Sequence, residues 1–122
     1  MFTNTVAVYL YRHIVDFRKA INGLSLIVEQ EMGLDLFDQC LFVFCNRGRD
    51  KIKILYWDWN GFCLWQKRLE KDHFKWPKTS EGNTINLNES QLNWLLQGVD
   101  ISQIKPHKTL HYKSVNWLIL LW

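Results

Sequence analysis

Several features are scarce or missing in this chain of 122 residues, and each absence excludes a class of protein. Six glycines and two prolines are too few for a collagen-like or low-complexity chain, and three cysteines are too few for a disulfide scaffold. No apolar run reaches the ~20 residues that a membrane-spanning helix needs, and the N-terminus lacks the pattern of a secretory signal. We therefore expect one cytoplasmic domain that keeps its cysteines reduced and does not associate with membranes.

The motifs of common catalytic sites are also missing. There is no glycine-rich phosphate loop, no His-Glu-x-x-His motif and no Gly-x-Ser-x-Gly turn. Cys40, Cys45, Cys63 and His73 are potential zinc ligands, but the cysteines lie in apolar, strand-like runs and not in close pairs on turns. The spacing of the carboxylates gives no support for a two-metal nuclease site. We expect no enzyme activity, no metal ion and no cofactor.

Hydrophobic residues make up 48% of the chain, which is enough for the core of one domain, and their spacing predicts two helices. Apolar residues recur at helical spacing over residues 16–32, where Asp16 is expected to cap the helix and Gly33 to end it. The second helix is expected over residues 88–98. Asn88 and Gln91, three residues apart, are typical of a capping box at its start.

The remaining β-rich segments predict strands at residues 6–11 and 39–46 and a hairpin over residues 51–70. Asn60-Gly61 favours a type I′ turn in this hairpin. Such a turn would place Lys53 opposite Arg68, an unfavourable pairing unless an anion or an acidic group lies over the two cations. The expected fold is a single α+β domain in which the hairpin is central to an antiparallel sheet and both helices pack on that sheet.

Charge is distributed unevenly along the chain. Residues 47–78 contain nine lysines and arginines against four acidic residues, whereas residues 1–46 contain three basic and five acidic residues. A basic middle segment of this kind indicates an anionic partner. Within it, Trp57, Trp59 and Trp65 lie between two groups of basic residues, a combination that suits nucleic acid because cations neutralise phosphates and rings stack on bases.

Nine basic residues are the candidate nucleic-acid contacts. Arg18 and Lys19 are placed by the predicted helix in its first turn, where free amides and the helix dipole favour an anion; the alternative is that they pair with Asp16 or another acidic residue. A basic groove along the hairpin requires Lys53, Lys67 and Arg68 to share an exposed face. A charged strand face beside a tryptophan core would have the same sequence. The candidates are Arg18, Lys19, Arg47, Arg49, Lys51, Lys53, Lys67, Arg68 and Lys71.

Longer blocks of this sequence resemble one protein family. The blocks are residues 16–24, 41–47, 51–58, 60–70 and 74–77, followed by residues 91–100 of the second predicted helix. In this order they are similar to the TnpB accessory proteins, encoded by the second open reading frame of the insertion sequence sixty-six family of bacterial transposons. The resemblance covers about residues 6–113, so we expect a transposon accessory domain at 1–113 and an added apolar tail at 114–122.

The resemblance implies a part in transposition beside a separate transposase, which carries the catalytic acidic residues. It brings no catalytic residues to this chain. Two hypotheses follow for the mechanism. The first is an accessory protein that binds DNA at the transposon ends through the basic hairpin and assists the transposase. The second is an adaptor that binds other proteins of the element through aromatic and apolar surface, including the tail, and does not contact DNA.

Overall fold

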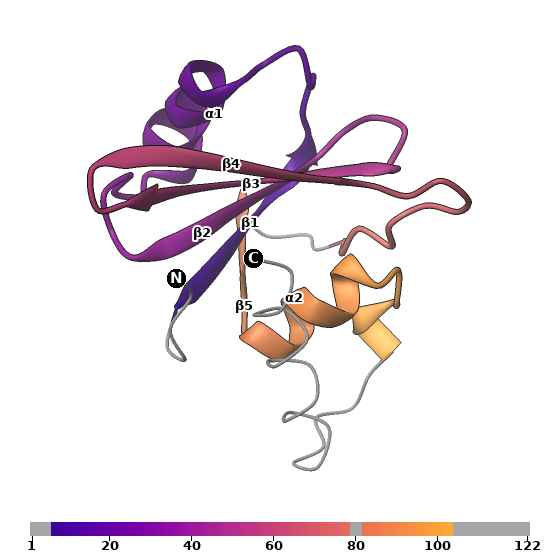
Figure 1. The fold of residues 1–122 in the computed structure, drawn as a ribbon. Coiled ribbons are helices and arrows are strands. Elements are labelled where there is room, and N and C mark those ends of the chain that lie inside the picture. Colours follow the sequence, from indigo (N-terminus) through magenta and orange to yellow (C-terminus); the bar gives the residue numbers. More distant parts are fainter. Residues whose placement is uncertain (1–5, 79–81, 104–122) are drawn as a thin grey trace.

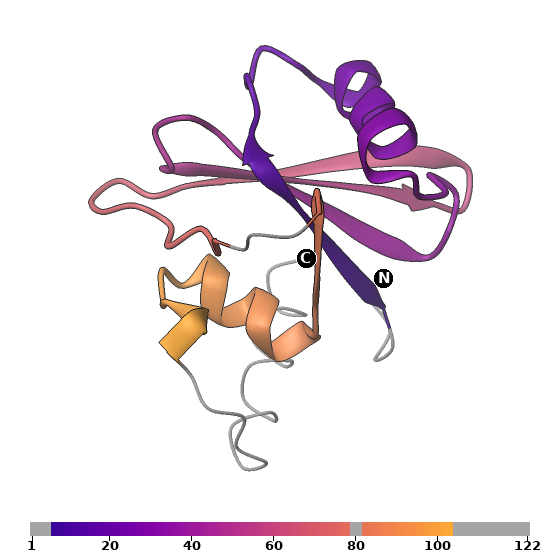
Figure 2. The same ribbon diagram turned by 180° about the vertical axis from the view of Figure 1, so that it is seen from behind.

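The computed structural model describes residues 6–78 and 82–103, which form one α+β domain. A five-stranded sheet separates two helices that lie on opposite faces (Figures 1 and 2). The strands are β1 (Ala7–Ile14), β2 (Cys40–Cys45), β3 (Lys51–Asp58), β4 (Gly61–Arg68) and β5 (Thr84–Leu87). The helical segments are α1 (Ile21–Ile27), a π-helical turn η1 (Val28–Met32), α2 (Glu89–Leu96) and a 3-10 turn η2 (Ile101–Gln103).

The predicted α+β class, the hairpin and the two packed helices are confirmed, but the hairpin is not central, because β4 is an edge strand, and the sheet is mixed and not antiparallel throughout. Its strand order is β4-β3-β2-β1-β5, and β1 and β2 are parallel while the other neighbours are antiparallel. The parallel pair arises because α1 and its flanking loops connect β1 to β2 as a crossover, which returns the chain in its original direction. β5, which the sequence does not predict, pairs with β1 at the edge of the sheet.

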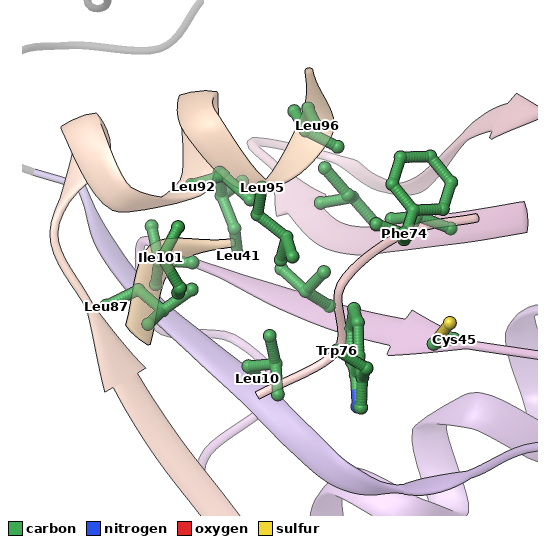
Figure 3. Close-up of a cluster of buried hydrophobic side chains, with 14 of the residues drawn as sticks. Leu10, Leu41, Cys45, Phe74, Trp76, Leu87, Leu92, Leu95, Leu96 and Ile101 are labelled. Carbon is green, nitrogen blue, oxygen red and sulfur yellow. The ribbon is translucent and has the colours of Figure 1, made fainter. Parts of the chain in front are cut away.

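Each face of the sheet has its own apolar core. On one face, Leu92, Leu95 and Leu96 of α2 point toward the sheet (Figure 3). Phe74 and Trp76 join this core from the irregular segment after β4, and the Trp76 indole donates to the carbonyl oxygens of Tyr11 and Arg12 at 3.3 and 3.2 Å. On the other face, α1 and η1 cover a second cluster that contains Leu24, Val28, Phe42, Phe44 and Leu55.

The first helix starts later than its apolar spacing indicates. Residues 16–19 form a tight turn: the Asp16 side chain accepts a hydrogen bond from the Arg18 amide at 2.9 Å, and the Lys19 amide donates to the Asp16 carbonyl at 3.0 Å. An aspartate that satisfies nearby amides in this way favours a turn over a helix. The expected start at residue 16 and the capping role of Asp16 are therefore wrong, and α1 begins at Ile21. The expected end is confirmed, because Gly33 has the left-handed φ of 66°.

The second helix closely follows the prediction from its sequence. Asn88 accepts from the Gln91 amide at 2.8 Å, and the Gln91 side chain accepts from the Asn88 amide at 2.9 Å, which completes the capping box. Gly98, two residues past the end of α2, has a φ of 85°. Both ends of this helix are encoded by residues that are close in sequence, which is why local patterns identify them.

The hairpin forms with a register two residues away from the predicted one. Its turn consists of Trp59 and Asn60, so the predicted Asn60-Gly61 turn is wrong. Trp59 has a φ of 54°, and the Asn60 amide donates to the Asp58 carbonyl at 2.5 Å. Asp58 therefore pairs with Gly61, and Lys53 lies opposite Gln66 instead of Arg68. Arg68 pairs with Lys51, and its guanidinium contacts Glu70 at 2.9 Å, so an acidic neighbour relieves the like-charge pair.

Two further expectations concern the C-terminal end of the chain and its relation to membranes. The apolar tail at 114–122 and the end of the expected domain at 113 lie outside the described residues. No helix within residues 6–78 and 82–103 is long and apolar enough to cross a membrane.

The cysteines should differ in reactivity because β2 is buried. Burial is the main cause that raises the pKa of the Cys40 and Cys45 thiols to about 12, and the thiolate is the reactive form. Cys63 is partly exposed on β4. We expect one fast-reacting thiol per folded chain with a disulfide reagent such as DTNB at neutral pH, and three after unfolding in guanidinium. Three fast thiols in the folded protein would contradict the burial of β2.

Candidate nucleic-acid interface

The most basic part of the described chain surrounds the loop between β2 and β3, residues 46–50. Hydrogen bonds hold this loop in place. The side-chain amide of Asn46 donates to the Asp50 carboxylate at 2.8 Å, and the backbone amides of Leu69 and Phe74 donate to the Asp50 and Arg49 carbonyls at 2.7 and 2.6 Å. The bond from Asn46 is the main cause that lowers the pKa of Asp50. Arg49 has a φ of 57°, in the left-handed region that arginine seldom occupies. The loop therefore presents its arginines from a fixed backbone.

One open cleft lies on the α1 side of this loop and has a volume of about 690 Å³. Arg18, Arg47 and Lys51 line it, together with Asp16 and the apolar residues Ile14, Val15 and Phe17. Arg18 contacts Asp16 at 2.6 Å, and its guanidinium lowers the pKa of that carboxyl to about 2. The cleft therefore contains three cations for one carboxylate, a balance that favours an anionic ligand.

A second open cleft, of about 610 Å³, lies on the other side of the same loop. Its charged rim contains Arg49, His73, Lys75, Lys78 and Asp100. The His73 Nδ1 atom lies 2.8 Å from the Gly48 carbonyl oxygen and donates to it, because a carbonyl oxygen only accepts. Gly48 lines both clefts, so the two basic surfaces are continuous around the loop.

We call this surface the basic end of the molecule. It comprises the cations of the two clefts and Lys71, which follows Leu69 in the segment that is bonded to the loop at Asp50. In Figure 1 the β2–β3 loop and the segment after β4 extend from the same end of the sheet, opposite the β3–β4 turn. The basic end contains Arg18, Arg47, Arg49, Lys51, Lys71, His73, Lys75 and Lys78.

Lys53, a predicted contact, lies away from solvent and has a structural role. Only 8% of the residue is exposed, and its ammonium donates to the Phe17 and Lys19 carbonyls at 3.0 and 2.9 Å and lies 4.8 Å from the centre of the Phe17 ring. Desolvation by burial lowers its pKa. Lys53 therefore attaches the turn before α1 to the sheet, and we do not include it in the proposed interface.

Lys67 and Arg68 point to opposite faces of the sheet, as neighbours in a strand do. The Lys67 ammonium donates to the Leu96 carbonyl at the end of α2 at 2.8 Å, and desolvation lowers its pKa. Arg68 is on the α1 face and is engaged with Glu70. Lys53, Lys67 and Arg68 thus do not form a single exposed basic face, and the structure does not support a groove along the hairpin.

Arg18 and Lys19 precede α1 and do not lie in its first turn. The expected anion site of helix amides, dipole and two cations is therefore not formed, and Arg18 adopts the alternative pairing with Asp16. Lys19 is exposed next to Gly23, and its carbonyl accepts from Lys53. Only Arg18 of the two lines the cleft beside the β2–β3 loop.

The expected stacking tryptophans do not lie beside the cations. Trp65 packs against the core under α2, and Trp57 and Trp59 lie at the β3–β4 turn, at the other end of the sheet. Sequence reasoning in turn does not select His73, Lys75 and Lys78, because their proximity to Arg49 depends on how the irregular segment after β4 folds back. Alternation of Phe74 and Trp76 with these polar residues is the one local signal that this segment has a buried side.

Within residues 6–78 and 82–103, no group of three or more histidine, cysteine, aspartate or glutamate residues is arranged to hold a metal ion. The lysine and arginine side chains of the basic end can neutralise the charge of an anion and donate hydrogen bonds to it.

Comparisons with known proteins identify relatives for most of the chain. A family model described as IS66 Orf2 like protein matches residues 6–106. Two similar proteins come from Sinorhizobium fredii: the uncharacterized protein y4hO is 36% identical over 95 residues, 78% of this chain and 82% of y4hO. The uncharacterized protein y4jC is 31% identical over 91 residues, 75% of this chain and 77% of y4jC. No solved structure matches significantly.

Proposed function

Because the chain belongs to the family of IS66 Orf2-like proteins and is thus an accessory protein of transposition, we propose that its basic end binds the DNA of the element and so assists a separate transposase. The DNA contacts are the phosphates of the duplex at the transposon ends. Arg47 and Lys51 contact phosphates from one cleft, and Arg49 with Lys75 and Lys78 from the other. The protein itself performs no catalysis in this proposal.

The main support for the proposal is that cations from three separate segments lie around the β2–β3 loop, which hydrogen bonds hold in place. Arg18 comes from the turn before α1, Arg47 and Arg49 from the β2–β3 loop, Lys51 from the start of β3, and Lys75 and Lys78 from the segment after β4. Residues 21–46, by contrast, contain no lysine or arginine. A basic surface on one end of a domain is the electrostatic footprint of nucleic-acid binding, whereas cations dispersed over all faces mainly affect solubility.

The test is a binding titration of the full chain against labelled duplex DNA from the transposon end, repeated over a range of salt concentrations. Each phosphate contact lowers the slope of log affinity against log salt by about 0.9 in a duplex, so contacts from about five cations predict a slope near −4.5. Scrambled duplex and single-stranded DNA are the controls. Preference for the end sequence would add base readout to phosphate contact.

Binding that falls steeply with salt supports the proposal. Absence of binding at low salt, or affinity that is insensitive to salt, contradicts it. The adaptor hypothesis would then account better for the family assignment, and the transposase of the same element would be the partner to test.

A further inference from the structure

A group of four aromatic side chains, two of them exposed and two half-buried, lies at the opposite end of the sheet from the cations. Trp59, at the centre of the β3–β4 turn, is 88% exposed, and Phe37, in the loop before β2, is 58% exposed. Phe37 contacts Trp57 and Phe62 with ring centres 5.0 and 5.7 Å apart, and the Trp57 and Phe62 rings are 4.9 Å apart across the hairpin. We call Phe37, Trp57, Trp59 and Phe62 the aromatic end.

The Phe37, Trp57 and Phe62 rings hold one another in place, and Phe37 and Trp59 stay exposed to solvent. Trp57 and Phe62 are cross-strand partners on the α1 face, and Phe37 packs edge-on against Trp57 at an interplanar angle of 82°. Large exposed aromatic residues that are fixed by their neighbours are typical of the centre of protein interfaces, because little conformational entropy is lost when a partner covers them.

The backbone of Trp59 provides a second observation. Its φ of 54° is in the left-handed region, where a bulky residue is disfavoured by roughly 1 kcal/mol or more, whereas Gly61 two residues later does not have a positive φ. The strained conformation places an indole at the tip of the hairpin instead of burying it. Folding alone does not explain a strained tryptophan in solvent, since glycine would fit the same turn without strain.

The charges around the rings identify the kind of partner. Asp35 accepts from the Phe37 amide at 2.9 Å, Asp38 follows Phe37, and Asp58 lies between Trp57 and Trp59. All three aspartates are exposed. Residues 54–66 contain no lysine or arginine, and neither do residues 21–46. Phosphates of DNA would be repelled here, whereas an arginine would gain both a carboxylate and an aromatic face.

We infer that the aromatic end is a docking site for a basic segment of a partner protein, with arginines that pair with Asp35 or Asp58 and stack on Trp59. The site does not depend on DNA binding, because it is at the other end of the sheet from the β2–β3 loop (Figure 1). A protein occupied at both ends would connect DNA to its partner.

The experiment uses overlapping synthetic peptides that span the transposase of the same element, with binding to the full chain measured by fluorescence anisotropy. We expect at least one arginine-containing peptide to bind and acidic peptides not to bind. Trp59→Gly should weaken that binding by about tenfold, as expected for an exposed aromatic hot spot, and Asp35→Asn with Asp58→Asn should weaken it and reduce its salt dependence. Ile14→Thr, which alters an exposed apolar residue at the basic end, is the matched control and should leave the affinity unchanged.

Each variant is also measured for stability and for DNA binding. Trp59→Gly should have a thermal midpoint no lower than the parent, since it removes backbone strain, and should bind DNA unchanged. If the parent protein binds DNA but no peptide, only this inference is rejected. If it binds a peptide but not DNA, only the proposed function is rejected.

Four results would overturn the inference. The first is that no peptide binds the full chain, and the second is that binding is the same in Trp59→Gly and in the control. The chain self-associates in sedimentation and Trp59→Gly abolishes this, which assigns the site to a second copy. Peptides bind only after Trp117 and Trp122 are replaced by serine, which assigns the site to the chain's own C-terminal segment.

Discussion

Replacing Arg47 and Arg49 together by glutamate is expected to weaken binding to transposon-end duplex by about a hundredfold at ~0.1 M salt. The two side chains line the clefts on opposite sides of the β2–β3 loop, so the double variant removes cations from both surfaces and adds repulsion toward phosphate. The slope of log affinity against log salt should become less steep by about 1.8, which corresponds to the loss of two phosphate contacts. The salt titration described above measures both quantities.

A matched control separates a binding site from the effect of net charge. Arg47→Glu alone changes the charge of the chain by two, and so does Gln39→Glu with Asn60→Glu, both exposed positions at the aromatic end. We expect about a tenfold loss for the first and less than about a twofold change for the second. Equal losses would show that overall charge and not the loop determines affinity, and DNA binding unaffected by the double arginine variant would favour the adaptor hypothesis.

Lys53→Ala should lower the free energy of unfolding by about 3 kcal/mol. The substitution leaves the carbonyls of Phe17 and Lys19 without the ammonium that bonds them, and it removes an aliphatic stem packed beneath the turn before α1. Urea unfolding followed by tryptophan fluorescence gives the midpoint and slope from which the change is calculated.

Lys51→Ala is the natural comparison, because Lys51 is two residues earlier on the same face of β3 but is only partly buried. It should change the free energy of unfolding by less than about 0.5 kcal/mol. If the two variants unfold at the same urea concentration, the bonds from Lys53 do not stabilise the turn, and Lys53 would return to the set of residues to test for DNA contact.

The elements predicted well from sequence are those encoded by neighbouring residues. The capping box of Asn88 and Gln91 and the stop at Gly33 each depend on a few consecutive positions, and both form as expected. The start of α1 shows the limit, since the turn made by Asp16 competes with helical spacing over the same residues. The parallel pairing of β1 with β2 depends on where the crossover returns, which periodicity does not encode.

In the candidate site, too, the features set by neighbouring residues are predictable from sequence and those set by distant residues are not. The basic β2–β3 loop was identifiable because Arg47, Arg49 and Lys51 are close in sequence. The same closeness in sequence groups Lys53 with them, although Leu55 and Trp57 on the same strand face indicate that this face is apolar. Lys67 donates to Leu96, a partner far along the chain, so no local pattern reveals its role at the end of α2.

The position of β1 has a consequence for synthesis of the protein. The first strand of the chain lies between β2 and β5, so Val8 pairs with Leu41 on one side and with Leu87 on the other. A nascent chain emerging from the ribosome can assemble β2, β3 and β4 from sequential neighbours, but one edge of β1 stays open until residues 84–87 have been translated. An open strand edge is a site of intermolecular pairing. Chains truncated before β5 are therefore the ones we expect to aggregate.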